Sequence, residues 1–188
     1  MRLLLSVCAV LGLAFSAGAR APQPVADAVI LSGGLPKLLS DYRFFKDGAG
    51  WQPNDRVVPY RLNMPLFSDY AEKYRFIYVP PGQQAKADGD GLLAFPVGSA
   101  LIKSFGYEID GKPRLLETRV LLHRADGWLA LPYVWNAEQT EARLKVAGQR
   151  IPLTFNDPSG REHEIDYGVP NKNQCKECHA LSGAVTPI

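Results

Sequence analysis

The sequence predicts a mainly β protein, built as an antiparallel sheet or sandwich with short helices at its N-terminal side. Between residues 74 and 169, segments rich in aromatic and β-branched residues alternate with turn signals at nearly regular spacing. The 17 glycines and 15 prolines favour many turns over a helical bundle. A hydrophobic content of 46% in 188 residues is enough for the core of one domain, or of one domain with an appendage.

Few regular elements are expected before residue 74. Residues 20–30 show no clear pattern and are expected to be flexible, whereas residues 38–45 suit a short helix or turn. Residues 53–65 contain three prolines and are expected to be irregular. Residues 66–74 suit one or two turns of helix.

Strands are expected from residue 74 onward. They cover residues 74–79, 100–109, 115–123, 128–135, 143–147, 151–156 and 164–169. The dipeptides Asp110-Gly111 and Asp126-Gly127 predict tight hairpin turns, because Asp-Gly suits a turn that needs positive φ. Another turn is expected at residues 157–160, and the tail from residue 171 is expected to begin a short helix or loop.

The first 19 residues have the pattern of a secretory signal peptide. Arg2 supplies the positive start, residues 3–15 form an apolar run, and residues 17–19 form a small-residue cleavage site. The run is short for a membrane span, so we expect cleavage, loss of Cys8 and no transmembrane anchor in the mature chain. The expected location is the bacterial periplasm or the outside of the cell.

We therefore expect a signal peptide at residues 1–19, an N-terminal extension at residues 20–45 and a β-rich domain at residues 46–188. The chain has 21 basic and 19 acidic residues, which gives a net charge of +2. This balance gives no reason to expect a nucleic acid or an anionic membrane surface as a partner.

One short motif near the C-terminus carries chemistry. Cys175-Lys176-Glu177-Cys178-His179 has the C-x-x-C-H spacing at which a c-type haem is attached covalently. Cys175 and Cys178 would each form one thioether bond, and His179 would ligate the iron from one side. Export supports this interpretation, because bacterial haem c is attached outside the cytoplasm. The sequence thus predicts one covalent haem c on a C-terminal attachment segment.

The same residues have two other uses. In an oxidising compartment, Cys175 and Cys178 can form a redox or structural disulfide. They can also contribute to a zinc site, for which His123 or His163 would supply a fourth ligand. The second C-x-x-C pair that usually completes such a zinc site is absent.

The second axial position of the iron is left open by the sequence. An ordinary small cytochrome c uses a methionine downstream of the motif, and none follows His179 here. Met64 is expected to fill space in the core, and His123 and His163 are expected to be ordinary strand or surface histidines. Each is also a candidate second ligand. Without one, the iron would keep an open position for a small molecule.

Lys103 lies in the expected strand 100–109. Alternation places it on one face with Leu101, Phe105, Tyr107 and Ile109. Burial among such residues would lower its pKa and make it a better nucleophile. The pattern alone favours the simpler interpretation, an edge lysine whose ammonium reaches solvent.

The next expected strand, residues 115–123, carries charged residues on one of its two faces. One face carries Leu115, Glu117, Arg119, Leu121 and His123, and the opposite face, expected to be core, carries Leu116, Thr118, Val120 and Leu122. Glu117 and Arg119 are expected on a solvated face with cross-strand partners, with a haem propionate or a polar pocket as the alternative. The aromatic residues expected in the core are Trp128, Tyr133 and Trp135.

Several stretches resemble a known family of exported bacterial proteins. They are residues 65–70, 95–98, 117–119, 126–136 and 173–179. On these stretches, residues 40–188 resemble the first half of a family identified as dihaem c-type cytochromes. Its members usually continue into a second C-x-x-C-H region, which does not occur in these 188 residues, so one haem is expected here.

A second resemblance is more local. Phe95, Gly98, Ser99 and Lys103 follow the pattern F-x-x-G-[ST]-x-x-x-K and resemble a segment of the cytochrome P-460 and cytochrome c′-beta proteins. This resemblance implies an antiparallel β fold with histidine as the only axial ligand from the protein. It also implies a bond between Lys103 and the haem, as in P-460 members. P-460 members oxidise hydroxylamine, and c′-beta members bind nitric oxide or carbon monoxide.

The expected function is electron transfer by an exported haem c protein together with a redox partner protein. One alternative is a P-460-like haem enzyme or gas-binding protein that acts on hydroxylamine or nitric oxide. The other is an exported β-sandwich binding module without haem, in which Cys175 and Cys178 form a disulfide.

Overall fold

The computed structural model describes residues 23–87, 89 and 91–187. Strands account for 44% of the residues and helices for 8%, which confirms the mainly β expectation. The expected signal peptide at residues 1–19 lies outside the described residues. Within the part of the chain that is described, no helix is both long enough and apolar enough to cross a bilayer.

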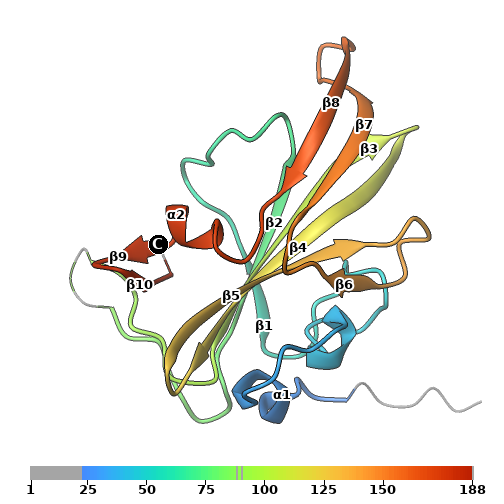
Figure 1. Ribbon diagram of the computed structural model, residues 1–188. Coiled ribbons are helices and arrows are strands. Elements are labelled where there is room, and N and C mark those ends of the chain that lie inside the picture. The colour runs from blue at the N-terminus through green and yellow to red at the C-terminus, as the bar shows by residue number, and fades with distance from the viewer. Residues whose placement is uncertain (1–22, 88, 90, 188) are drawn as a thin grey trace, which may run out of the picture.

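A six-stranded antiparallel sheet forms the body of the protein (Figure 1). Its strands are β1 (Val57–Tyr60), β2 (Glu72–Tyr78), β3 (Ala100–Ile109), β4 (Lys112–Arg124), β5 (Gly127–Trp135) and β6 (Ala142–Leu144). They lie side by side in the order of the sequence. Asp110 and Gly111 have φ values of 51° and 69°, so the expected tight turn joins β3 to β4.

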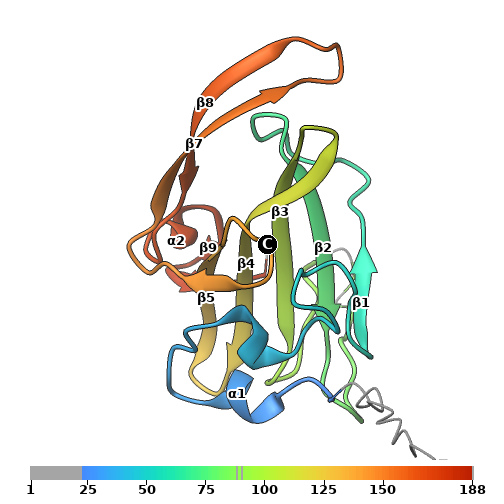
Figure 2. The same ribbon diagram turned by 90° about the vertical axis from the view of Figure 1, so that its right-hand side faces the viewer.

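Among the described residues, two hairpins and three short helices accompany the sheet. One hairpin is β7 (Gln149–Asn156) with β8 (Glu162–Val169), and the other is β9 (Ala180–Leu181) with β10 (Ala184–Val185). The helices are α1 (Asp27–Leu31), the 3-10 helix η1 (Leu39–Tyr42) and α2 (Cys175–Cys178). Figure 2 shows that the β7–β8 hairpin projects from one end of the large sheet. The described fold is therefore one large sheet with two separate hairpins, and not a sandwich of two large sheets.

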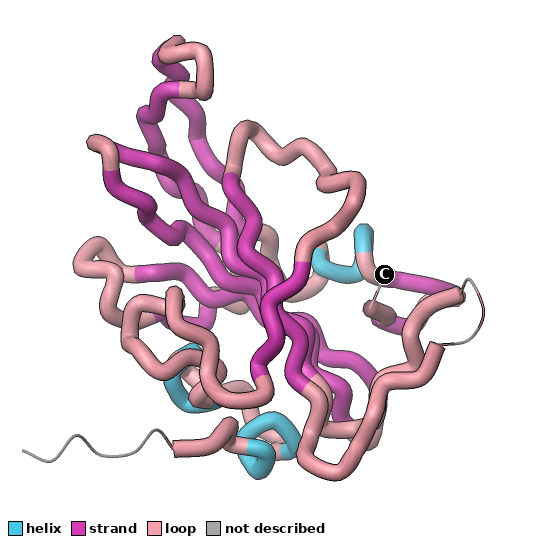
Figure 3. The backbone as a smooth tube through the Cα atoms, turned by 180° about the vertical axis from the view of Figure 1, so that it is seen from behind, coloured by secondary structure: helices cyan, strands magenta, loops and turns pink. Residues whose placement is uncertain are grey.

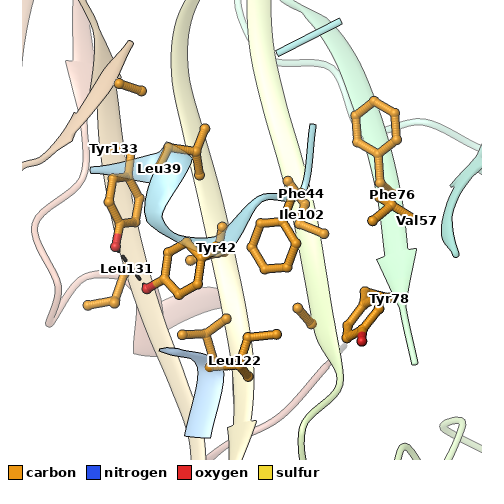
Figure 4. Packing of buried hydrophobic residues seen from close by; sticks show 14 of the residues in the cluster. Leu39, Tyr42, Phe44, Val57, Phe76, Tyr78, Ile102, Leu122, Leu131 and Tyr133 are labelled. Carbon is orange, nitrogen blue, oxygen red and sulfur yellow. Dashed lines mark hydrogen bonds between the residues drawn. The ribbon is translucent and has the colours of Figure 1, made fainter. Parts of the chain in front are cut away.

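The N-terminal residues cover one face of the sheet. Val25, Ile30, Leu39, Tyr42 and Phe44 are buried in a cluster with sheet residues. The hydroxyls of Tyr42 and Tyr133 lie 2.9 Å apart within this cluster (Figure 4). The expectation of a flexible start at residues 20–30 is wrong for the part described, because α1 packs on the sheet and buries Ile30.

The opposite face of the sheet has two apolar regions. The β7–β8 hairpin covers one region through Leu153, Phe155, Tyr167 and Val169, which pack with residues of the sheet that include Phe105 and Tyr107. The C-terminal tail covers the other through Cys175 and Val185. Figure 3 shows α2 apart from the two N-terminal helices, beside the sheet.

A bulge in β4 changes which residues share a face. Phe105 pairs with Glu117 and Gly106 pairs with Leu115, so Leu116 is the extra residue. Leu115 therefore packs in the N-terminal cluster, and Leu116 packs in the cluster under the β7–β8 hairpin. This corrects the strict alternation expected for residues 115–123. Gly106 suits the bulge, because a Cβ there would lie 2.6 Å from the carbonyl oxygen of Arg114.

Three other expectations for the N-terminal half are wrong. Residues 53–65 contain β1, which tolerates Pro59 because it is an edge strand. Residues 66–71 form no helix, and β2 already begins at Glu72. Met64 was expected in the core and is instead 89% exposed.

We predict that Leu131→Ala lowers the free energy of unfolding by about 2–5 kcal/mol, because Leu131 is fully buried at the centre of β5. Urea unfolding followed by circular dichroism measures this loss. The control is Leu62→Ala, at a half-exposed leucine outside the strands, for which a change within about 0.5 kcal/mol is expected. Equal losses in the two variants would contradict this description of the core.

Candidate functional site

The C-x-x-C-H motif forms a single helical turn on the sheet. The Asn171 side chain accepts hydrogen bonds from the backbone N–H groups of Asn173 and Gln174, both at 2.9 Å, and so starts the turn. Cys175 is buried and Cys178 is exposed. His179 follows directly as the C-cap residue of α2 and is half-buried. The motif thus has one cysteine facing the protein and one facing solvent.

Under the motif, the sheet presents an apolar row. Cross-strand partners in β2, β3, β4 and β5 form this row from Ile77, Leu101, Leu121 and Ala130. Cys175 packs with Leu121 and Ala130, and Val185 of β10 packs beside them. The burial of these side chains holds the tail on this face of the sheet.

The next row of the same face is positively charged. Arg75 of β2, Lys103 of β3 and Arg119 of β4 are direct cross-strand partners, and we call them the cationic row. Lys103 lies in the interior of the sheet, so the expectation of an edge lysine is wrong. Its Nζ lies 4.8 Å from the centre of the Phe105 ring. The Arg119 guanidinium lies 4.3 Å from the centre of the same ring.

The surroundings of Lys103 lower its pKa to about 8. Burial is the largest cause, and the positive charges of Arg75, Arg119 and Lys73 act in the same direction. Glu117 opposes the shift. A larger fraction of Lys103 is therefore an uncharged amine near neutral pH than for an exposed lysine.

Glu117 is the buried anion beside the cationic row. Its side chain is 0% exposed and accepts hydrogen bonds from Arg119 Nε at 2.9 Å and Nη2 at 2.5 Å. The Tyr167 hydroxyl donates to the same carboxylate at 2.6 Å. The expectation of a solvated face is wrong for Glu117, which the β7–β8 hairpin covers through Tyr167, whereas the Arg119 side chain is 31% exposed. Burial and the Glu117 charge raise the pKa of Tyr167.

The His179 ring has the properties of a metal ligand in its neutral form. Burial is the largest effect and lowers the pKa of its imidazole. The Thr186 backbone raises this pKa, and the positive charges of Lys103 and Arg119 lower it again. The ring is therefore neutral at pH 7, which is the state that binds a metal. Its Nδ1 is buried and has no hydrogen-bond partner among the described residues, which is rare for such an atom.

These residues fit a covalently attached haem. The two thiols have the required order and spacing, and an imidazole follows them directly. Leu121 and Ala130 of the apolar row are already covered by the tail, whereas the half-buried Ile77 and Leu101 suit the apolar part of a porphyrin, and the adjacent cations suit its carboxylates. The structure thus brings Cys175, Cys178, His179 and Lys103 to one face of the sheet.

The two alternative uses of the cysteines receive less support. Cys175 and Cys178 are both free thiols, and burial raises the pKa of Cys175. No group of three or more potential metal ligands forms among the described His, Cys, Asp and Glu residues. The described residues therefore lend no support to a zinc site with a distant histidine.

Both candidate histidines have partners of their own. The His123 ring stacks on Trp128 at 4.6 Å, and its Nδ1 lies 2.8 Å from the Phe95 carbonyl oxygen. His163 stacks on Phe155 and lies 2.8 Å from the Asp157 carboxylate. These contacts match the expectation of ordinary strand histidines. Tyr133 and Trp135 are buried core residues as expected, and Trp128 is half-buried.

Sequence reasoning missed Arg75. A signal was present, because Lys73, Arg75 and Ile77 alternate with the aromatic residues of β2. This pattern usually marks a solvated face, whereas Arg75 is only 7% exposed. The covering of this face, and hence the burial of Arg75, is a tertiary property.

Comparisons of the chain with protein-family models, curated proteins and solved structures find no match. The site is therefore interpreted from its own chemistry.

We predict that Lys103→Met stabilises a haem-free chain at pH 7 by on the order of 1 kcal/mol, because it removes a buried cation that faces two others. Between pH 8 and 10.5 the unfolded chain holds more protons at Lys103 than the folded chain, so the lysine becomes less destabilising as the pH rises. The advantage of Lys103→Met is thus expected to shrink by pH 10.

Urea unfolding of the Cys175→Ala/Cys178→Ala background at pH 7 and pH 10 measures this difference. The control is Lys112→Met, at an exposed lysine of β4. A destabilising Lys103→Met, or a gain that is the same at both pH values, would show that Lys103 is not held in this environment.

Proposed function

We propose that this protein is an exported c-type haem protein that carries one covalent haem and transfers electrons. The observation that carries the proposal is the position of the C-x-x-C-H motif, with Cys175 packed on an apolar row that adjoins the cationic row of the same sheet face. A C-x-x-C-H sequence could occur without an apolar row and a cationic row beside it, so their presence is additional support. The bound haem would supply an iron that accepts and releases one electron.

Cys175 and Cys178 would hold the haem. Each thiol would add across one vinyl group, so that an S–C bond forms and the thiol hydrogen ends on the other vinyl carbon. This addition needs no net oxidant or reductant. His179 would bind the iron through the ring nitrogen that its neutral state leaves free for a metal.

The exposed part of the motif supports exchange of electrons with another protein. Lys176, Glu177 and Cys178 all lie at the surface. The signal-peptide pattern of residues 1–19 supports action in the periplasm or outside the cell, where haem c is attached. A redox partner protein would approach this exposed side.

Lys103 favours a second candidate function. Its positive charge lowers the pKa of His179, and it lies one row along the sheet from Leu101, in the apolar row on which the tail packs. A haem with only one protein ligand and an amine nearby would suit a P-460-like enzyme or gas-binding protein that acts on hydroxylamine or nitric oxide. The binding module with a Cys175–Cys178 disulfide has no comparable support, since both thiols are free.

The test is an optical spectrum of the purified chain, produced in a bacterium that attaches haem c. We predict haem absorption that survives denaturation, because the thioether bonds hold the haem. Cys175→Ala/Cys178→Ala should abolish this covalent haem, and His179→Ala should retain some attachment but change the iron spectrum. A colourless wild-type protein would refute the proposed function.

A further spectrum separates the two candidate functions. A six-coordinate low-spin iron that does not bind nitric oxide supports electron transfer. A five-coordinate iron that binds nitric oxide supports the second function. We predict that Lys103→Ala changes the spectrum more than the control Lys112→Ala, because the Lys103 charge acts on His179 and Lys112 is exposed. Identical spectra of the two variants would remove Lys103 from the site.

A further inference from the structure

We infer that Arg75, Lys103 and Arg119 form a binding site for a carboxylate or oxyanion. The anion site itself does not depend on the proposed function. Only the identification of a haem carboxylate as the anion rests on it. In the haem-loaded protein the source would be a carboxylate of the haem. The alternative source with the same chemistry is a free inorganic oxyanion.

The first argument is geometric. Arg75, Lys103 and Arg119 are opposite one another on three adjacent strands, and their side chains leave the same face of the sheet. Neighbouring strands are about 4.8 Å apart, so three cationic side chains begin within about 10 Å. An anion of the size of a carboxylate or phosphate can be reached from more than one of them.

The second argument is the balance of charge. Glu117 is the carboxylate beside the cationic row, and Arg119 and Tyr167 already use it. Among the described residues, neither Arg75 nor Lys103 forms an ion pair. The Arg75 guanidinium has one long hydrogen bond, from Nη1 to the Lys73 carbonyl oxygen at 3.4 Å. The cationic row therefore carries more positive than negative charge.

The third argument is energetic. Like charges directly opposite in a sheet repel one another, and a buried cation without a partner is costly. Arg75 is 7% exposed, so most of its side chain is removed from water. An anion bound across the row would offset both costs. Arginine also suits carboxylates and oxyanions, because its guanidinium donates two parallel hydrogen bonds.

The fourth argument is the neighbouring chemistry. The apolar row of Ile77, Leu101, Leu121 and Ala130 adjoins the cationic row on one side. The motif packs on the apolar row, and the charges of Lys103 and Arg119 reach His179. An amphipathic group with a flat apolar body and a carboxylate edge would match both rows. A haem has this division of surface.

The first experiment uses a haem-free chain and needs no haem chemistry. Its parent is the full chain with Cys175→Ala/Cys178→Ala. We expect inorganic phosphate, compared with sodium chloride at equal ionic strength and pH 7, to raise the melting temperature by about 2–4 °C. We also expect the phosphorus NMR signal of phosphate to broaden when this protein is added.

Matched variants localise the effect. Adding Arg75→Gln and Lys103→Gln to the parent should abolish the phosphate effect. The control adds Lys112→Gln and Arg143→Gln, which remove the same charge from exposed positions and should leave the effect intact. The single variant Arg75→Gln, which should reduce the effect at least twofold, provides a milder test if the double change prevents folding.

The second experiment repeats the phosphate titration with the haem-loaded wild-type chain. Loss of the phosphate effect would mean that a haem carboxylate fills the cationic row. A persisting effect would identify a free oxyanion as the ligand, which overturns the haem as its source. The inference itself is overturned if phosphate does not stabilise the haem-free parent, or stabilises the row variant equally. This result is independent of whether the chain attaches haem.

Discussion

The buried carboxylate of Glu117 joins the parts of the fold that surround the site. It belongs to β4, it accepts two hydrogen bonds from Arg119 on the same strand, and it accepts a third from Tyr167 of β8. Replacing Arg119 or Tyr167 would remove hydrogen bonds from the buried Glu117 carboxylate, and replacing Glu117 would leave the donors of the other two residues without their acceptor. Through this network the β7–β8 hairpin is fixed over the sheet, and Arg119 is held beside the tail that carries the motif.

The two faces of the sheet differ in what they contribute: one packs the main core and the other carries the candidate site. Its first face is closed by residues 25–44, which bury aromatic rings and stabilise the fold. Its second face is divided among an aromatic region under the β7–β8 hairpin, the cationic row and an apolar row under the tail. The bulge at Leu116 matters here, because it allows Leu115 to serve the first face while Glu117 still faces the second. Charged residues can therefore be buried on one face without disturbing the main core.

The C-terminal tail contains only short elements and makes few contacts with the sheet. It consists of one helical turn and a hairpin of two-residue strands, held mainly by Cys175 and Val185 on the sheet. So small an element has little stability of its own, because a short helix gains few hydrogen bonds for the residues it orders. A covalent group anchored at Cys175 and Cys178 and placed along the adjacent rows would add contacts that the tail itself does not supply.

Local patterns in the sequence were sufficient for the strands from β2 to β8, because alternating aromatic and β-branched residues between Asp-Gly turns specify a meander of neighbouring strands. The spacing of Cys175, Cys178 and His179 likewise identified the candidate site without any structure. The burial of Glu117 and Arg75, the interior position of Lys103 and the exposure of Met64 were decided only by the tertiary structure. Alternation states which side chains share a face, but it does not state what covers that face. For Glu117 the cover comes from Tyr167 of a hairpin far along the chain, and for Leu121 and Ala130 it comes from the C-terminal tail.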